Sequence, residues 1–223
     1  MDDSSFTAEL WRGSADIYAA ILAHPFLTGL TDGTLPADAF GYYVVQDALY
    51  LRDYAQALAA VGSRAPDGPA IEMFSRHAAD IIAVERSLHD TLLAELGIDP
   101  AEIGRAEPAP ATLAYTSYLL ATVRGGTYAE GVGVVLPCYW IYWEVGKELL
   151  RRGSPDPRYR AWIGTYGGEE FGGVVRSVLS VADALGPGLA PAERAAVHRH
   201  FRATSRYEWM FWDMGWRKEA WPV

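Results

Sequence analysis

The chain has 223 residues and carries 28 acidic against 19 basic side chains, a formal net charge of -9. This charge repels nucleic acid phosphates and anionic membrane surfaces, so we expect neither as a partner. A single cysteine excludes an internal disulfide and a zinc site built from thiolates alone. Because the N-terminus shows no targeting pattern and no stretch has the roughly 18 apolar residues of a membrane span, we expect a cytoplasmic protein.

Apolar residues recur every three or four positions along the chain, which predicts an all-α fold. Gly and Pro divide this pattern into about eight helices, and no connection exceeds roughly 15 residues, so we expect one domain over residues 1–223. The helices are predicted at about 5–23, 37–62, 70–96, 111–123, 128–152, 158–168, 171–186 and 192–220, with loops at 24–36 and 98–110.

The helix predicted at 128–152 carries the lone cysteine. Cys138 and Tyr142 are four residues apart and therefore share one face, whereas Trp140 and Trp143 lie on the opposing side. A helix that is apolar on nearly every side belongs in the middle of a molecule. Pro137 removes one backbone hydrogen bond and should bend the axis just before the thiol. The local sequence alone favours the interpretation of Cys138 as a small buried hydrophobe, as most free cysteines are.

Carboxylates occur within aromatic stripes on two other predicted helices. Tyr43, Asp47, Tyr50 and Tyr54 follow one another at helical spacing. A tyrosine hydroxyl alone would satisfy a partly buried aspartate there. Glu208 lies between Tyr207 and Trp209, and burying such a carboxylate without a partner is costly and shifts its pKa.

If these helices converge, one thiol, two carboxylates and several tyrosines surround a flat apolar cavity. Such a cavity suits a planar heteroaromatic ring, because aromatic faces would sandwich it while the carboxylates pair with ring nitrogens and an exocyclic amine. A thiolate could add to an electron-poor ring carbon while an acid protonates the ring nitrogen. This chemistry needs neither a metal nor a cofactor.

Six segments, in order, carry a resemblance to a known family: HPF at 24–26, YYVVQDALYL at 42–51, AYTSY at 114–118, PCYWIYWEVG at 137–146, WIGTYGGEEF at 162–171 and YEWMFWDM at 207–214. Together they resemble the TenA family, thiaminase II or aminopyrimidine aminohydrolase, in its cysteine-containing type. The resemblance covers nearly the whole chain. It implies a helical bundle of the haem-oxygenase-like type that assembles as a homotetramer.

The resemblance also implies roles for individual residues. Cys138 would be the nucleophile, Glu208 would protonate the pyrimidine nitrogen, and Asp47 would bind the amino group and a ring nitrogen. The pocket tyrosines would be Tyr50, Tyr115, Tyr142 and Tyr166. Water would replace an amine, or the thiazolium of thiamin, on the exocyclic methylene, giving 4-amino-5-hydroxymethyl-2-methylpyrimidine in thiamin salvage. No Lys or Arg lies in the segment around Cys138, so its activation would depend on tyrosine hydroxyls or on the substrate.

A metal oxidoreductase of the same fold class is the first competing hypothesis. Glu85 and His89 are four residues apart on the helix predicted at 70–96. However, a di-iron bundle takes Glu-x-x-His ligands, and the sequence contains no such motif. We interpret His77, Glu85 and His89 as a solvated or hydrogen-bonded helix face.

A non-catalytic ligand-binding or regulatory protein is the second. The acidic balance and the lack of a basic recognition helix speak against direct DNA contact. The remaining histidines are interpreted as structural: His24 as a cap before a proline, and His198 and His200 as solvated surface.

Overall fold

The computed structural model describes residues 4–223, except for the side chains of 84–92, 94, 95, 100 and 102. Over the described residues the fold is all-α, as predicted, and no strand is present. The helices are α1 (Phe6–Arg12), α2 (Ala15–Leu22), α3 (Pro25–Asp32), α4 (Ala37–Ser63), α5 (Gly68–Leu96), α6 (Pro100–Arg105), α7 (Pro110–Gly125), α8 (Tyr128–Arg152), α9 (Pro157–Gly167), α10 (Glu169–Leu185), a short 3-10 helix η1 (Gly186–Gly188) and α11 (Pro191–Arg217).

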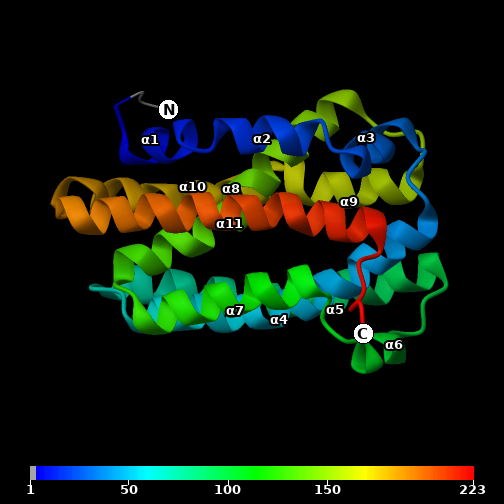
Figure 1. The fold of residues 1–223 in the computed structure, drawn as a ribbon, viewed down its shortest axis with the longest axis horizontal. Coiled ribbons are helices and arrows are strands. Elements are labelled where there is room, and N and C mark those ends of the chain that lie inside the picture. Colours follow the sequence, from blue (N-terminus) through cyan, green and yellow to red (C-terminus); the bar gives the residue numbers. More distant parts are fainter. Residues whose placement is uncertain (1–3) are drawn as a thin grey trace.

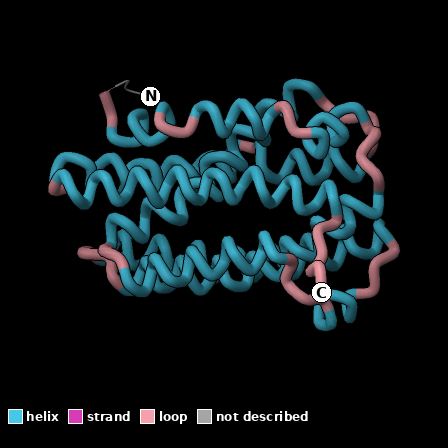
Figure 2. Tube along the Cα trace, in the orientation of Figure 1, coloured by secondary structure: helices cyan, strands magenta, loops and turns pink. Residues whose placement is uncertain are grey.

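The long helices lie in layers (Figure 1). α9, α10 and α11 run across the middle of the view, α4, α5 and α7 form a layer below them, and α1, α2 and α3 follow one another along the top, while α8 crosses obliquely from the lower layer toward the top. Figure 2 shows that mostly short loops join the helices. None of the helices in the described part of the chain combines the length and apolar character that a membrane crossing requires.

α8 is the central helix, as its apolar sequence predicted. It packs against α11, α9, α10, α7, α4 and α3. A capping box starts it, because Glu130 N donates to Thr127 Oγ1 at 3.2 Å and Thr127 N donates to Glu130 Oε2 at 2.7 Å. Gly153 ends it at a φ of 75°, which favours glycine. α8 continues through Pro137 and carries Cys138 into the interior.

α8 and α9 approach so closely that their backbones touch. A Cβ atom added to Gly146 would lie 2.5 Å from the Gly167 nitrogen, and one added to Gly167 would lie 2.6 Å from the Gly146 carbonyl oxygen. Two glycines therefore allow this approach. It brings Tyr166, at the end of α9, against Tyr142 of α8 with a ring separation of 5.0 Å.

Three predictions about the helices were wrong. Residues 5–23 form two helices, because the chain turns at Gly13 and Ser14, where Arg202 donates a hydrogen bond to the Gly13 carbonyl. The predicted loop 24–36 contains α3, which ends at Gly33 with a φ of 71°. The predicted loop 98–110 contains α6, at whose start Asp99 Oδ1 accepts from Ala101 N at 2.9 Å.

Candidate active site

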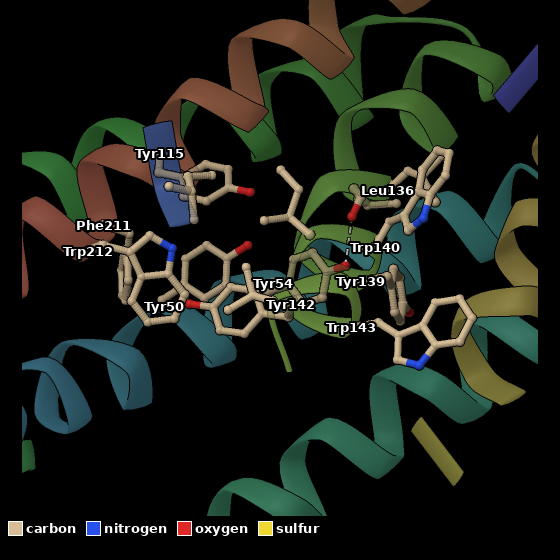
Figure 3. Close-up of a cluster of buried hydrophobic side chains, with 14 of the residues drawn as sticks. Tyr50, Tyr54, Tyr115, Leu136, Tyr139, Trp140, Tyr142, Trp143, Phe211 and Trp212 are labelled. Atoms are coloured by element: carbon tan, nitrogen blue, oxygen red, sulfur yellow. Dashed lines mark hydrogen bonds between the residues drawn. The ribbon is translucent and has the colours of Figure 1, made fainter. Parts of the chain in front are cut away.

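Five helices carry the side chains that the sequence singled out. The predicted stripe on α4 lies inward, since Tyr43, Asp47, Tyr50 and Tyr54 are all buried. The other side chains come from α7 (Tyr115), α8 (Cys138 and Tyr142), α9 (Tyr166) and α11 (Glu208). Figure 3 shows Tyr50, Tyr115, Tyr142, Phe211 and Trp212 gathered in one cluster from four of these helices.

The aromatic rings form two connected walls. Tyr50 lies 4.9 Å from Tyr115 and 5.4 Å from Phe211, measured between ring centroids. Tyr142 lies 5.0 Å from Trp212, and its hydroxyl is 2.8 Å from the Tyr43 hydroxyl. These separations are typical of aromatic contacts, so the rings define a rigid apolar enclosure with hydroxyls at defined points.

Glu208 is almost completely buried, with 1% of its surface exposed. The Tyr115 hydroxyl donates a hydrogen bond to Glu208 Oε1. Burial raises the pKa of this carboxyl from 4.5 to about 8; the Tyr115 hydrogen bond lowers it, and the charge of Asp47 raises it further. Most of the Glu208 carboxyl is therefore protonated at neutral pH.

Cys138 is partly exposed, although buried tyrosines surround it. Burial raises the pKa of the thiol well above its usual value, and the charges of Glu208 and Asp47 add to this, while hydrogen bonding from Tyr50 and Tyr54 lowers it. The thiol therefore lies in an apolar, aromatic environment, although the residue as a whole is partly exposed. A groove of about 930 Å³ lies between α4, α6 and the C-terminus and contains none of the predicted site residues.

Asp47 faces the same interior as the thiol. It is 5% exposed, and its charge raises the pKa of Tyr43, of Tyr166 and of Glu208. The preceding residue, Gln46, makes its hydrogen bonds to the segment at the start of α7 and not to the site. Its Oε1 accepts from Ala109 N and Thr112 Oγ1, both at 2.8 Å, and its Nε2 donates to Glu107 O at 3.0 Å. These hydrogen bonds join α4 to the start of α7 and fix the turn of α4 that carries Asp47.

The sequence analysis did not assign two aromatic side chains, Phe211 and Trp212, to the site. Phe211 and Trp212 follow Glu208 by three and four residues, so helical periodicity could have placed all three on one face. Within the described part of the chain, the indole N–H of Trp212 is buried without a hydrogen-bond partner, and a polar ligand next to it would satisfy it.

The histidines are mostly structural. His24 caps α3 as expected, because its Nδ1 accepts from Phe26 N at 3.1 Å. The interpretation of His198 and His200 as solvated surface was wrong: both are half-buried, His198 packs against Phe6, and His200 Nδ1 lies 2.8 Å from the Tyr118 hydroxyl. The side chains of Glu85 and His89 lie outside those described. Among the described residues, no three His, Cys, Asp or Glu side chains are grouped so that they could hold a metal ion.

Comparison with known proteins decides the family. Residues 11–218 match the sequence profile of the TENA/THI-4/PQQC family. The chain belongs to this family. It is similar to the aminopyrimidine aminohydrolase of Bacillus subtilis, with 37% identity over 97% of this chain and 89% of that protein. It is also 39% identical to part of the thiamine biosynthesis multifunctional protein ThiED of Corynebacterium efficiens, over 96% of this chain and 28% of that longer protein.

Solved structures confirm the predicted fold type of this TenA-family chain. A TenA homologue from P. horikoshii superimposes with a TM-score of 0.88 and 32% identity, covering 96% of this chain and 99% of that one. A Shewanella denitrificans domain with a haem-oxygenase-like fold gives a TM-score of 0.75 at 18% identity, covering 95% of this chain and 92% of that one. The latter likeness concerns the fold alone.

Proposed function

We propose that the chain is an aminopyrimidine aminohydrolase of thiamin salvage. It replaces the amine on the exocyclic methylene of an aminopyrimidine by water and releases 4-amino-5-hydroxymethyl-2-methylpyrimidine; the thiazolium of thiamin would be an alternative leaving group. The observation that carries this proposal is that the partly exposed Cys138 lies within the electrostatic reach of two buried carboxyl groups, Glu208 and Asp47, among buried aromatic side chains. The relative in Bacillus subtilis, named for this activity, supports it.

The walls suit a planar ring. The rings of Tyr50 and Tyr115, with Phe211 beside them, offer apolar faces to a pyrimidine. Asp47 would accept a hydrogen bond from the exocyclic amino group and pair with a ring nitrogen, which a neutral side chain of the same shape would do less strongly. Tyr142 and Tyr166 would line the side where the substituent departs.

The protonation states set the order of events. With a pKa of about 8, Glu208 holds a proton at neutral pH and can give it to a ring nitrogen. The Cys138 thiol is protonated as well, because burial raises its pKa. The free protein therefore contains a neutral thiol, and the nucleophile forms only when a substrate ring is present to accept the sulfur.

The reaction then proceeds in four steps. Cys138 sulfur bonds to a ring carbon, the thiol gives up its proton, and the electron pair of the broken ring double bond takes the Glu208 proton at the ring nitrogen. The C–N bond to the protonated amine breaks and the pair leaves on ammonia. Water adds to the exocyclic methylene and gives one proton to the Glu208 carboxylate. Finally the ring nitrogen loses its proton to ammonia, the C–S bond breaks with its pair returning to sulfur, and the thiol regains its proton.

The proposal is tested by a variant that lacks the Cys138 sulfur. We expect Cys138→Ala to abolish release of hydroxymethylpyrimidine from its aminomethyl analogue while the near-UV circular dichroism stays that of the wild type. Tyr128→Phe, on the same helix and outside the site, is the matched control and should retain full activity. Full activity in the Cys138 variant would rule out the covalent route. Binding of the analogue without turnover by the wild type would indicate a ligand-binding protein instead.

A further inference from the structure

The first turn of α7 is capped by residues from distant parts of the chain. The helix starts at Ala109 and Pro110, and neither supplies a capping side chain. Ala is a poor residue at a helix N-terminus, where free amides need partners. The Ala111 amide donates to Glu219 Oε2 at 2.9 Å, although the two residues are 108 positions apart in the chain. A local Ser, Thr or Asp would have capped the helix, so this long-range contact calls for an explanation.

Gln46 of α4 holds the same turn of α7. Its side-chain oxygen accepts from the Ala109 amide and the Thr112 hydroxyl, and its side-chain nitrogen donates to the Glu107 carbonyl. Gln46 and Thr112 are 2% and 1% exposed, so water cannot replace these hydrogen bonds without opening the structure. The start of α7 is therefore fixed against α4.

The chain that follows α11 is attached to the same corner of the molecule. The Tyr42 hydroxyl of α4 donates to the Glu219 carbonyl oxygen, and the Trp221 indole N–H donates to Pro108 O at 3.0 Å. Figure 1 shows this segment descending from the end of α11 to the lower layer of helices. It links α11 to α4 and to the residues directly before α7.

These contacts join the three helices that carry Asp47, Tyr115 and Glu208. Asp47 directly follows Gln46 on α4. Tyr115 lies one helical turn after Thr112 on α7, and its hydroxyl donates to Glu208 of α11. Because a helix moves largely as one body, a shift of the first turn of α7 would carry the Tyr115 hydroxyl away from Glu208. Small displacements of this kind have large effects on catalysis.

We propose that Gln46 and Glu219 are positioning residues of the site, a role that deepens the proposed function and rests on it. They fix the first turn of α7 to α4 and to the chain after α11, and so hold the Tyr115 hydroxyl against Glu208. This contact sets how firmly Glu208 keeps the proton that it gives to the ring nitrogen. Neither positioning residue needs to touch the substrate.

The proton of Glu208 reports on this arrangement. The Tyr115 hydrogen bond lowers the pKa of Glu208, whereas burial and the charge of Asp47 raise it. Loss of the Tyr115 hydrogen bond should therefore raise this pKa further, whereas water that enters a loosened site should lower it. The other titratable groups that interact with Glu208 are Tyr43 and Tyr50 of α4, Cys138 and Tyr142 of α8, and Tyr166 of α9.

The first experiment compares two substitutions of one residue. Glu219→Ala removes the cap of α7, whereas Glu219→Gln keeps an oxygen that can accept from Ala111 N. We expect Glu219→Ala to move the alkaline limb of kcat/KM, which reports on the free protein, to higher pH by about one unit, the scale of one hydrogen bond to a charged group. Glu219→Gln should keep the wild-type profile. A limb in Glu219→Ala that moves to lower pH or does not move would overturn the proposal.

A double-variant comparison tests whether the effect acts through Tyr115. Tyr115→Phe removes the hydroxyl directly and should move the limb at least as far as Glu219→Ala does. Gln46→Met should move it in the same direction. In the Tyr115→Phe background neither Glu219→Ala nor Gln46→Met should add any further movement, because all three act on one hydrogen bond. Additive shifts would overturn the proposal.

Urea unfolding at a series of pH values gives the same information without a substrate. The pH at which the free energy of unfolding stops falling marks the pKa of Glu208 in the folded state, and it should rise in Glu219→Ala but not in Glu219→Gln. Parallel profiles for the wild type and Glu219→Ala would overturn the positioning role.

Asp67→Ala is the matched control. Asp67 Oδ1 accepts from Ala70 N at 2.9 Å and caps α5, which carries none of the predicted site residues. This variant should lower stability at every pH without moving either profile; an equal shift in it would show that the loss of any cap has this effect. Unfolding profiles that follow the expectation in a chain that releases no hydroxymethylpyrimidine would refute the proposed function and leave the positioning role standing.

Discussion

The buried carboxyl of Glu208 should make folding stability depend on pH in a way that a single substitution isolates. The folded state holds this proton with a pKa of about 8, whereas an unperturbed glutamate has a pKa of 4.5. The folded chain therefore binds more protons than the unfolded chain between these two values, and its free energy of unfolding falls as the pH rises through them. This contribution is fully present below 4.5 and is lost by about pH 8.

The magnitude follows from the two pKa values. A tenfold change in proton affinity corresponds to about 1.4 kcal/mol, so between about pH 5 and pH 8 the wild type loses about 3 to 4 kcal/mol through Glu208. Glu208→Gln keeps the shape and still accepts the Tyr115 hydroxyl, but it has no proton to lose. The free energy of unfolding of the variant relative to the wild type should therefore increase by that amount over the interval.

Urea unfolding followed by tryptophan fluorescence at a series of pH values measures this difference directly. Glu148→Gln is a control of opposite sign, because Arg151 and Arg152 lower the Glu148 pKa to about 2 and its effect should appear only in the acid range, below about pH 4.5. Parallel pH profiles for the wild type and Glu208→Gln would refute the assignment of a protonated carboxyl to the site.

Further outcomes concern activity and packing. Turnover should fall as the pH rises through about 8, because Glu208 loses the proton it donates, and Glu208→Gln should lose far more turnover than substrate affinity; a collapse in affinity alone would make Glu208 a binding residue. Asp47→Asn should raise KM and, by removing a negative charge, move the alkaline limb of the pH profile to lower pH; an unmoved limb would contradict the coupling. Gly146→Ala should cost about 1 to 3 kcal/mol of stability and raise KM, because the added Cβ would meet Gly167 and displace Tyr166. Gly164→Ala is the control: no atom lies within 4 Å of its added Cβ, so thermal unfolding should show a neutral or slightly stabilising effect.

The long helices and the inward faces of the site could be read from the sequence, because both rest on periodicity. The bounds of α8 agree with the prediction, and the α4 stripe from Tyr43 to Tyr54 is buried. Periodicity works there because each helix is long enough to repeat its pattern several times. The roles of the individual site residues remain proposals, since they came from the resemblance to the family.

Hydrophobic periodicity could not reveal the short helices. α3 and α6 complete only one or two turns, so no repeat develops, and their capping residues His24 and Asp99, each followed by a proline, were the signals that could have revealed them. The contact between His77 of α5 and Tyr139 of α8 could not be predicted either. The His77 Nδ1 atom lies 3.1 Å from the Tyr139 hydroxyl, and no one-dimensional pattern records which helix faces which.

The contact between α8 and α9 limits which molecules the enclosure can accept. Tyr166 is held in place by main chain lying on main chain at Gly146 and Gly167, so no side chain at that point can rotate aside for a larger guest. On the proposed function, a leaving group as bulky as a thiazolium would require α9 to shift as a whole. Selection for such a leaving group would therefore act first on α9 near Gly164, where an added Cβ would meet no atom within 4 Å, and only afterwards on the ring-lined walls themselves.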